Sequence, residues 1–442
     1  MKTLFAICAF AMAATAASAQ TVLSLNEAIA IGLEHNRNAA NAALQVEKAD
    51  QDVAVARTKR LPSFKVEAQA SQLLRPVDLT FARGAFGTIP GVGPIPDTDA
   101  TIRTPSTLNF VLSAEATQPL TQLRKLNLSV MLSQASREYQ REQLRDTRLA
   151  LVDEIRRTYY GIAQTKSAID ANTQTIALLD ELGRVVERRV VTKVALKSDA
   201  LTVDSRMAQA QLARLTLEHT MASQKEQLNL LLGRDVRTRF DVVDMPPITA
   251  VDTDLEAAQA RAIEGRPDVK QARIKLQQAE LARRVAKADY LPDVGLSVSY
   301  VSPLTIDGAP RQIATAALQA QWEPFDWGRK GRALATKSLE IQQARNSVRE
   351  TEDRVLLDVN VRYRKLDEAR AQLRAARIAQ DAARESARVK VAQYDARTAL
   401  LADVLQTEAS LADSDNQLQQ ALIAFWTARA DFARALGEES AQ

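Results

Sequence analysis

The sequence predicts a mainly α-helical fold with four β-strands, built from two tandem copies of one pattern: a helix, two strands and a long helical hairpin. Three observations support this fold class. Matching residues recur at a nearly constant separation, which indicates an internal repeat. Two stretches of more than about a hundred residues lack proline, as long helices require, because proline breaks a helix interior. Four short segments alternate apolar and polar residues, which is typical of strands with one apolar face.

The N-terminal segment has the pattern of a secretory signal peptide. Lys2 supplies a positive charge, residues 4–17 are apolar but too few to span a bilayer, and a small-residue triplet at 17–19 fits a cleavage site. We therefore expect residues 1–19 to be removed and the exported chain to begin at Gln20. Cys8 is the only cysteine, so the mature chain is expected to have no thiol or disulfide.

Composition gives no sign of an enzyme or of a nucleic-acid-binding protein. The 58 basic residues nearly balance the 54 acidic ones, and they are interspersed on helical faces instead of forming a basic block. His35 and His219 are the only histidines and lie far apart in polar helical sequence. No metal-ligand spacing, nucleophile elbow or phosphate loop occurs. We expect no catalytic residues, no cofactor and no metal.

The internal repeat sets the domain organisation. Displacement by 230 (291 − 61) places Leu61 on Leu291, and further along a displacement of 204 (363 − 159) places Tyr159 on Tyr363. The resulting units are a first repeat, a linker, a second repeat and a C-terminal tail. Their boundaries are residues 20–233, 234–253, 254–437 and 438–442.

Helices make up most of each repeat. Val152, Ile155, Tyr159 and Ile162 recur at spacings of three and four residues, which predicts a coiled-coil seam. Each repeat is expected to begin with one helix that a Leu-Pro pair ends, and to finish with a hairpin that turns back once. The first helices cover about 25–60 and 255–290, the hairpins about 120–232 and 326–436, and the turns lie near Lys193 and Arg397.

Two predicted strands lie between the helices of each repeat. In the first strand Phe64 and Val66 are apolar, whereas Lys65 and Glu67 are polar. The glycine- and proline-rich segment of about 73–106 is expected to be a long irregular surface loop. The four predicted strands cover about 63–71, 108–117, 293–301 and 313–322.

The apolar strand faces need a cover, and two arrangements supply one. The strands form a β-sandwich core, or they close into a barrel with the apolar face toward lipid and the polar face toward a lumen. Each segment has the roughly nine to ten residues that a tilted strand needs to cross a bilayer. Tyr300 and Trp322, at strand ends, are the expected membrane-interface aromatics. Four strands are too few to close such a barrel, so the second arrangement requires neighbouring copies of the chain.

The signal peptide, the duplicated pattern, the Leu61-Pro62 pair and the segment "EPFDWGRKG" at 323–331 together resemble the TolC-like outer-membrane efflux protein family. The resemblance covers essentially the whole mature chain, although the first repeat lacks the glycine that Gly328 supplies in the second. It implies a homotrimer whose strands close one twelve-stranded membrane β-barrel, continued by a periplasmic α-helical tunnel. It also implies the bacterial outer membrane as location, with outer-membrane lipid around the barrel.

The function implied by the resemblance is a passive conduit of a tripartite efflux or type I secretion system. Its partners would be a periplasmic adaptor (membrane fusion) protein and an inner-membrane pump. Two other classes of protein remain as alternatives: a structural or adhesive coiled coil, which does not explain the apolar strand faces, and an enzyme, for which no motif is present.

The resemblance also suggests gate residues at the hairpin tips. Tyr394 and Asp199 match positions that bond across neighbouring hairpins, and Asp403 matches an aspartate that lines the aperture as a ring of three. Lys193 and Arg397 stand where the family commonly has glycine, and they are expected adaptor-docking points.

Two departures alter the expected gate. Ala399 replaces a gate arginine of some members, and Gln406 replaces a second ring aspartate. One acidic ring is therefore expected, with Arg397 as a replacement for the missing cation. The alternative for Asp403 is a solvated residue or an acid that stabilises the start of the returning helix.

Overall fold

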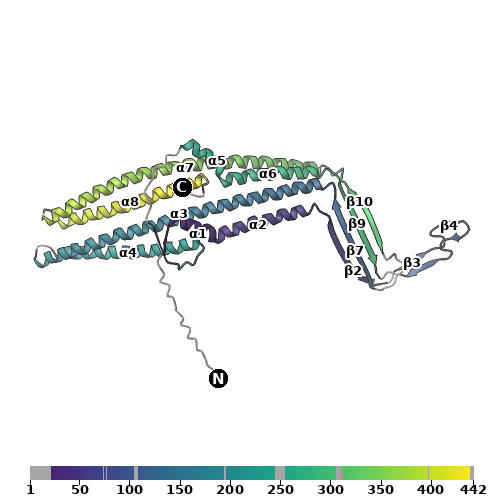
Figure 1. Cartoon of the computed structure of the whole chain (residues 1–442), viewed down its shortest axis with the longest axis horizontal. Coiled ribbons are helices and arrows are strands. Elements are labelled where there is room, and N and C mark those ends of the chain that lie inside the picture. Colours follow the sequence, from purple (N-terminus) through teal and green to yellow (C-terminus); the bar gives the residue numbers. More distant parts are fainter. Residues whose placement is uncertain are drawn as a thin grey trace, which may run out of the picture. The chain divides into compact units, whose positions relative to one another are not determined.

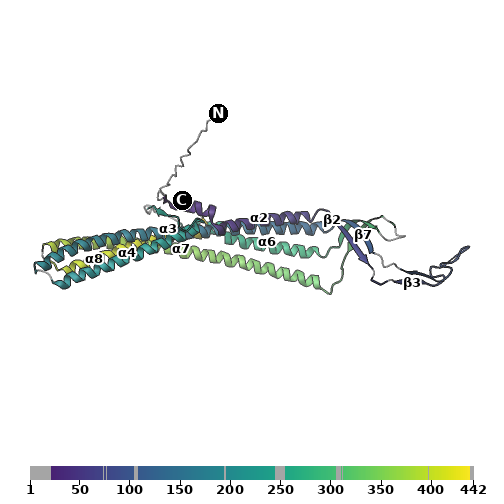
Figure 2. The same cartoon turned by 90° about the horizontal axis from the view of Figure 1, so that it is seen from below.

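The structure is a computed structural model, shown in Figures 1 and 2. The chain forms two compact units, which are described separately below. We call residues 1–47, 138–274 and 345–442 the helical unit, and residues 48–137 and 275–344 the sheet unit. The described residues are 21–72, 74–75, 77–103, 108–193, 196–243, 254–304, 310, 312–396 and 398–438.

Eight helices account for most of the described residues, and several of them run from one unit into the other. In both views α4 lies alongside α3 and α8 alongside α7, so each repeat ends in a helical hairpin (Figures 1 and 2). The helices are α1 (Leu25–His35), α2 (Arg37–Thr58), α3 (Leu123–Val191), α4 (Lys197–Leu231), α5 (Leu255–Gly265), α6 (Pro267–Ala288), α7 (Arg329–Asp395) and α8 (Leu401–Ala435).

The core of the helical unit lies where the two repeats place equivalent apolar residues. Ile155 and Ile162 on α3 are fully buried, as are Val359 and, nearly so, Leu366 on α7. These residues keep the predicted spacing and belong to one continuous hydrophobic cluster. Removal of this stripe from water is the main stabilising contribution to such long amphipathic helices.

The first helix of each repeat is broken, which corrects the prediction of single helices over about 25–60 and 255–290. The break falls at Asn36 in the first repeat and at the equivalent Arg266 in the second. Asn36 Oδ1 accepts the Ala39 N–H (3.1 Å) and Asn36 Nδ2 donates to the Leu231 carbonyl (2.8 Å). Arg266 donates to the equivalent carbonyl, that of Ala435 (3.4 Å). The side chain at the break therefore ties it to the end of the same repeat's hairpin.

A short sheet occupies part of the predicted linker of residues 234–253. Strand β8 (Phe240–Val242) pairs in parallel with β1 (Thr21–Leu23). Residues 244–253 lie outside the described residues, as does the predicted signal peptide, residues 1–19. Of the predicted tail only Glu438 is described.

The sheet unit contains one four-stranded antiparallel sheet in the order β10-β9-β7-β2, so β10 and β2 form its edges (Figure 1). Ala114 lies opposite Val66 on one side and Tyr300 on the other, and Ala116 lies opposite Val298. The apolar residues of all four strands therefore share one face, as their alternation predicts. The strands are β2 (Ser63–Gln72), β7 (Leu108–Pro119), β9 (Asp293–Pro303) and β10 (Ile313–Gln321).

The segment between β2 and β7 corrects a second prediction, because its described residues form short ladders and not an irregular loop. Leu79 pairs with Ile102 in one ladder, and Asp78 pairs with Arg103, whose Nε donates to Asp78 Oδ1 (2.8 Å). Apolar and polar residues alternate here as they do in the main strands. The ladders are β3 (Asp78–Phe81) with β6 (Ala100–Arg103), and β4 (Thr88–Ile89) with β5 (Gly93–Pro94).

Membrane-spanning helices were also sought. No helix in the described part of the chain has the length and apolar character needed to cross a bilayer.

Candidate functional site

The tips of the two hairpins meet in a small apolar cluster, which we call the tip cluster. It joins Leu182 and Val186 of α3, Val203 of α4, Tyr394 of α7 and Val404 of α8. All five side chains are buried. Tyr394, a predicted gate residue, is therefore a packing residue that holds the two hairpins of one chain together.

A cation lies on the Tyr394 ring. The Arg189 guanidinium carbon is 4.0 Å from the ring centroid. A cation–π contact of this kind contributes about 0.5–1 kcal/mol at an exposed site. Arg189 was missed by sequence reasoning, since nothing in the pattern relates a residue of the first hairpin to one about 200 positions later.

The two predicted gate aspartates occupy equivalent places at the starts of the returning helices. Asp199 Oδ2 accepts the Leu196 N–H (3.0 Å), and Asp403 Oδ2 accepts the Leu400 N–H (3.4 Å). A carboxylate in the first turn satisfies an unpaired helix N–H and interacts favourably with the helix dipole. No hydrogen bond joins Asp199 to Tyr394 in the described part of the chain.

Asp403 nevertheless differs from an ordinary capping residue in one respect. Its side chain is exposed, so its second carboxylate oxygen is available to solvent or to another copy of the chain. Its capping bond is also the longer of the two. The helix-start alternative for Asp403 thus has direct geometric support, and a ring role is compatible with it.

Lys193 lies in the exposed turn between α3 and α4, and its φ angle is 56°. This left-handed conformation favours glycine, because a Cβ atom crowds the following carbonyl. Arg397, the other predicted docking residue, lies outside the described residues.

We predict that Lys193→Gly stabilises this turn by about 0.5 kcal/mol, since relief of left-handed strain exceeds the entropic cost of glycine. Slower amide hydrogen exchange over residues 188–193 would measure the gain. Lys193→Ala is the control, because it removes the charge but keeps the strain. Equal protection in both variants would show that the charge and not the backbone determines the stability of the turn.

The second candidate region is the apolar face of the sheet. Phe64 is 80% exposed, Val66 71% and Leu318 69% in the single chain. A contiguous exposed apolar face of this kind marks an interaction or membrane surface. The edges at β2 and β10 also present unpaired backbone groups, which makes them ready to pair with another strand.

The two predicted interface aromatics lie toward opposite ends of this sheet. Tyr300 sits near the β9–β10 turn, opposite Ala314, and is about one-third exposed. Trp322 directly follows β10, and its indole Nε1 donates to the Tyr290 carbonyl (3.3 Å). The ring of Trp322 is mostly exposed. This placement suits two interfaces of one bilayer, with the amphipathic ring of each residue at the boundary.

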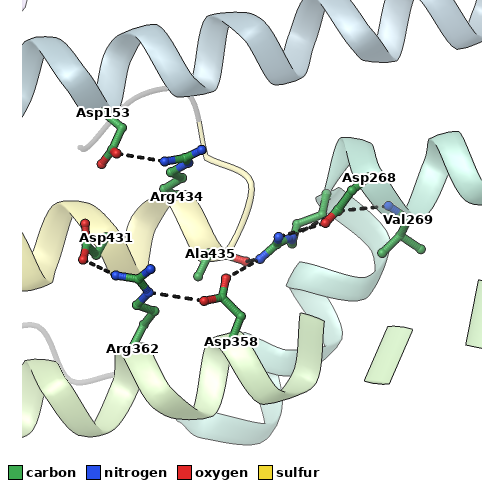
Figure 3. A network of polar contacts seen from close by, with 9 residues as sticks. Asp153, Asp268, Val269, Asp358, Arg362, Asp431, Arg434 and Ala435 are labelled. Atoms are coloured by element: carbon green, nitrogen blue, oxygen red, sulfur yellow. Dashed lines mark hydrogen bonds and ion pairs between the residues drawn. The ribbon is translucent and has the colours of Figure 1, made fainter. Parts of the chain in front are cut away.

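An Arg–Asp network lies in the helical unit, away from the hairpin tips (Figure 3). Asp431 of α8 forms ion pairs with both Arg157 of α3 and Arg362 of α7. Arg434 donates to Asp153 of α3 (2.9 Å). The network therefore crosses between the two repeats. It was also missed at the sequence level, because these charges are indistinguishable from solvated helix residues.

The network extends to the broken helix of the second repeat. Arg266 donates to Asp358 (2.8 Å), which also pairs with Arg362. Burial raises the pKa of the Asp358 carboxyl, but the hydrogen bonds from Arg266 and Arg362 outweigh it and hold the pKa below its ordinary value. Asp146 has no comparable donors, so burial and the charge of Asp268 raise its pKa.

A cavity of about 210 Å³ lies beside the network. Its charges balance, so it offers no net field for an anion or a cation. We therefore regard the network as structural. The charged lining residues are Arg157, Arg266, Arg362, Arg434, Asp146, Asp268, Asp358 and Asp431. Among the described residues, no group of three or more His, Cys, Asp or Glu side chains is placed to hold a metal ion.

Comparison with known proteins gives a consistent result. A family model described as "Outer membrane efflux protein" matches residues 29–234 and 259–438, one range in each repeat. An uncharacterized protein of Haemophilus influenzae is 25% identical over 304 residues, which is 66% of this chain and 60% of that protein. The match thus spans less than two thirds of that relative's length.

Solved structures with a similar fold include three outer-membrane proteins. The outer-membrane channel OprN has a TM-score of 0.77 at 18% identity, covering 93% of this chain and 89% of that chain. The outer membrane protein VceC of Vibrio cholerae has 0.74 at 16%, covering 94% and 96%. The Campylobacter jejuni CmeC outer membrane channel has 0.77 at 14%, covering 95% and 87%. At these identities the likeness shows the fold, and it confirms the predicted fold class of helical tunnel and barrel strands in two repeats.

Proposed function

The chain belongs to the outer membrane efflux protein family, and from this premise we propose that three copies form a passive channel across the outer membrane and into the periplasm. A periplasmic adaptor and an inner-membrane pump supply the cargo and the energy, in a tripartite efflux or type I secretion system. The channel itself performs no chemical reaction.

One observation carries the proposal: the sheet has a single exposed apolar face and two edge strands. Phe64 and Leu318, on the edge strands β2 and β10, are both mostly exposed. Lipid covers such a face without cost, and edges are removed when the strands of several copies close into a barrel. Three copies of four strands give twelve, which lies within the range of membrane barrels.

We further propose that Asp403 lines the periplasmic aperture as a ring of three carboxylates, one from each copy. Its exposure and its place at the hairpin tip support this role. Three carboxylates around one axis attract cations and repel anions, so the ring acts as a selectivity element. Lys193 and Arg397 at the tips are the proposed contacts for the adaptor.

The test is conductance in planar bilayers, with detergent-extracted protein, of wild type, Asp403→Asn and Asp199→Asn. Asparagine keeps an acceptor for the helix N–H but removes the charge. We expect wild type to conduct as a trimer with a cation preference. Asp403→Asn should lower the cation-to-anion permeability ratio by about two- to threefold, since a potential of order one kT changes local ion concentrations by that factor.

Asp199→Asn is the matched control, because Asp199 makes the equivalent capping bond in the first repeat. If Asp403→Asn behaves like Asp199→Asn and wild type, Asp403 is only a helix-capping residue. If wild type forms no trimer and no pore, the channel itself is disproved, and the apolar strand faces must be covered by protein.

A further inference from the structure

Within one chain, α3 of the first repeat packs against α8 of the second, and ion pairs mark the register of this boundary. Asp153 accepts from Arg434, and Arg157 pairs with Asp431 (Figure 3 labels Asp153, Arg434 and Asp431). The two helices run in opposite directions, so a step toward the tip on α3 matches a step back along the sequence on α8. We call this contact the α3–α8 boundary.

The repeat implies a second boundary of the same kind. At the displacement of 204, α7 is equivalent to α3 and α4 to α8, so α7 and α4 each carry the corresponding surface. At the α3–α8 boundary Tyr160 and Trp426 are buried, with ring centroids 5.9 Å apart. Their equivalents, Arg364 on α7 and Ala222 on α4, are exposed. The second boundary is therefore open in a single chain.

Large apolar side chains lie exposed along both of these helices. On the described part of α7 within the helical unit they are Leu357 (61%), Ile378 (70%) and Val389 (38%). On α4 they are Leu201 (58%), Leu212 (65%), Leu215 (48%) and Leu230 (64%). Solvent-facing helix positions normally carry polar residues, so these leucines, the isoleucine and the valine indicate a surface that is covered.

The register of the α3–α8 boundary brings these residues together in pairs. The repeat equivalents of Asp153 and Arg434 are Leu357 and Leu230, so an ion pair in the first boundary corresponds to a leucine pair in the second.

The antiparallel register extends the match toward the tip. Ile378 lies 21 residues (378 − 357) beyond Leu357, and Leu212 lies 18 residues (230 − 212) before Leu230. These steps differ by less than one helical turn of about 3.6 residues. A further 11 residues on each helix (389 − 378 and 212 − 201) reach Val389 and Leu201. Each exposed apolar residue on this part of α7 thus has a partner on α4 at its own height.

We infer that α7 of one copy packs against α4 of the next copy through an apolar seam made of Leu357–Leu230, Ile378–Leu212 and Val389–Leu201. The seam rests on the proposed function, because it requires several copies in a closed ring, and it specifies how they meet. A second copy is the occupant because both halves of the seam lie on this chain, in matching register. Such a head-to-tail contact closes into a ring when the rotation permits.

The seam gives the two boundaries different chemistry. Inside a chain the boundary at this level is ionic, whereas between chains it is apolar. Raised salt screens exposed and half-exposed ion pairs but strengthens or leaves unchanged the burial of apolar surface. Copies should therefore stay associated in salt concentrations that weaken the contact within each copy.

Cysteine cross-linking tests the seam directly. Cys8 is the only cysteine, so Cys8→Ser gives a background without thiols. In that background, Leu357→Cys with Leu230→Cys, and separately Val389→Cys with Leu201→Cys, are oxidised in the detergent-extracted full chain. Both members of each pair are exposed, so the variants are expected to fold. On a non-reducing gel we expect covalent dimers and trimers that dithiothreitol reverses.

Two further pairs are the controls. Gln380→Cys with Asp415→Cys joins residues that are hydrogen-bonded within one chain (2.7 Å), so it should cross-link without an increase in mass. Leu357→Cys with Leu201→Cys is mismatched by 29 residues (230 − 201), or roughly 43 Å of helix, and should give no product.

The outcomes separate the seam from the proposed function. Multimers from the matched pairs alone support the seam. A conducting trimer whose matched pairs stay at the mass of one chain overturns the seam and leaves the channel intact. Multimers from the mismatched pair as well would show non-specific collision and also overturn it. If the protein neither forms trimers nor conducts, the channel fails and the seam with it.

Discussion

Gly233→Ala is expected to destabilise the helical unit by about 3 kcal/mol. Gly233 ends the first repeat with φ = 69°, a left-handed conformation that costs a residue with a Cβ about 1–2 kcal/mol. In addition, a Cβ at this position would lie 2.2 Å from the His35 carbonyl oxygen. That atom belongs to the backbone at the end of α1, so relief of the overlap requires movement of the helix break itself.

Two other glycines separate these contributions. Gly437, the equivalent residue of the second repeat, has φ = 77°, but its Cβ would lie 3.2 Å from the nearest backbone atoms, those of Gly265 and Arg266. Gly87 has φ = 97° with nothing within 4 Å. We expect Gly87→Ala to cost about 1 kcal/mol, Gly437→Ala somewhat more, and Gly233→Ala the most.

The measurement is the midpoint of thermal loss of helical circular dichroism, with the same detergent and protein concentration for all variants. The concentration must be fixed because association with other copies shifts apparent stability. If all three substitutions lower the midpoint equally, the contact between Gly233 and His35 has no importance beyond backbone strain.

These glycines also show where sequence reasoning stopped. Periodicity predicted the helical hairpins and the shared apolar face of the strands, because both follow from one residue's spacing to the next. It did not predict the breaks at Asn36 and Arg266. Those depend on the chain folding back so that Gly233 and Gly437 touch the breaks. A local signal existed, since Pro267 occupies the first position of α6, where proline is favoured.

The candidate site was predicted less completely than the fold. Tyr394, Asp199 and Asp403 were selected by resemblance, and their positions at the tips follow from the hairpin pattern. Their contacts did not follow, because Arg189 reaches Tyr394 from the other repeat. Contacts between repeats depend on the rotation of each helix about its axis, and a shift of one residue changes that rotation by about 100°. Periodicity does not fix it to that accuracy.

The Arg–Asp network gives the second large effect, and it depends on one buried carboxylate. Asp431 is about one-tenth exposed and is shared by Arg157 and Arg362. Asp431→Asn preserves the size of the side chain but leaves two guanidinium groups facing each other without their shared anion. Removal of one partner from a buried ion pair costs about 3–5 kcal/mol. Because both arginines are more exposed than Asp431, we expect a value near 3 kcal/mol.

Thermal unfolding of Asp431→Asn, followed by circular dichroism as above, provides the measurement, and Asp180→Asn provides the matched control. Asp180 pairs with Arg184 on the exposed surface of α3, where loss of an ion pair costs less than about 0.5 kcal/mol. A second substitution then tests the cause. If repulsion between the two arginines is responsible, Arg157→Met in the Asp431→Asn background should restore part of the stability, because only one cation then remains. If the double variant is no more stable than Asp431→Asn alone, the loss reflects a missing hydrogen-bond acceptor and not an unbalanced charge, and the network holds the two repeats together through geometry more than through electrostatics.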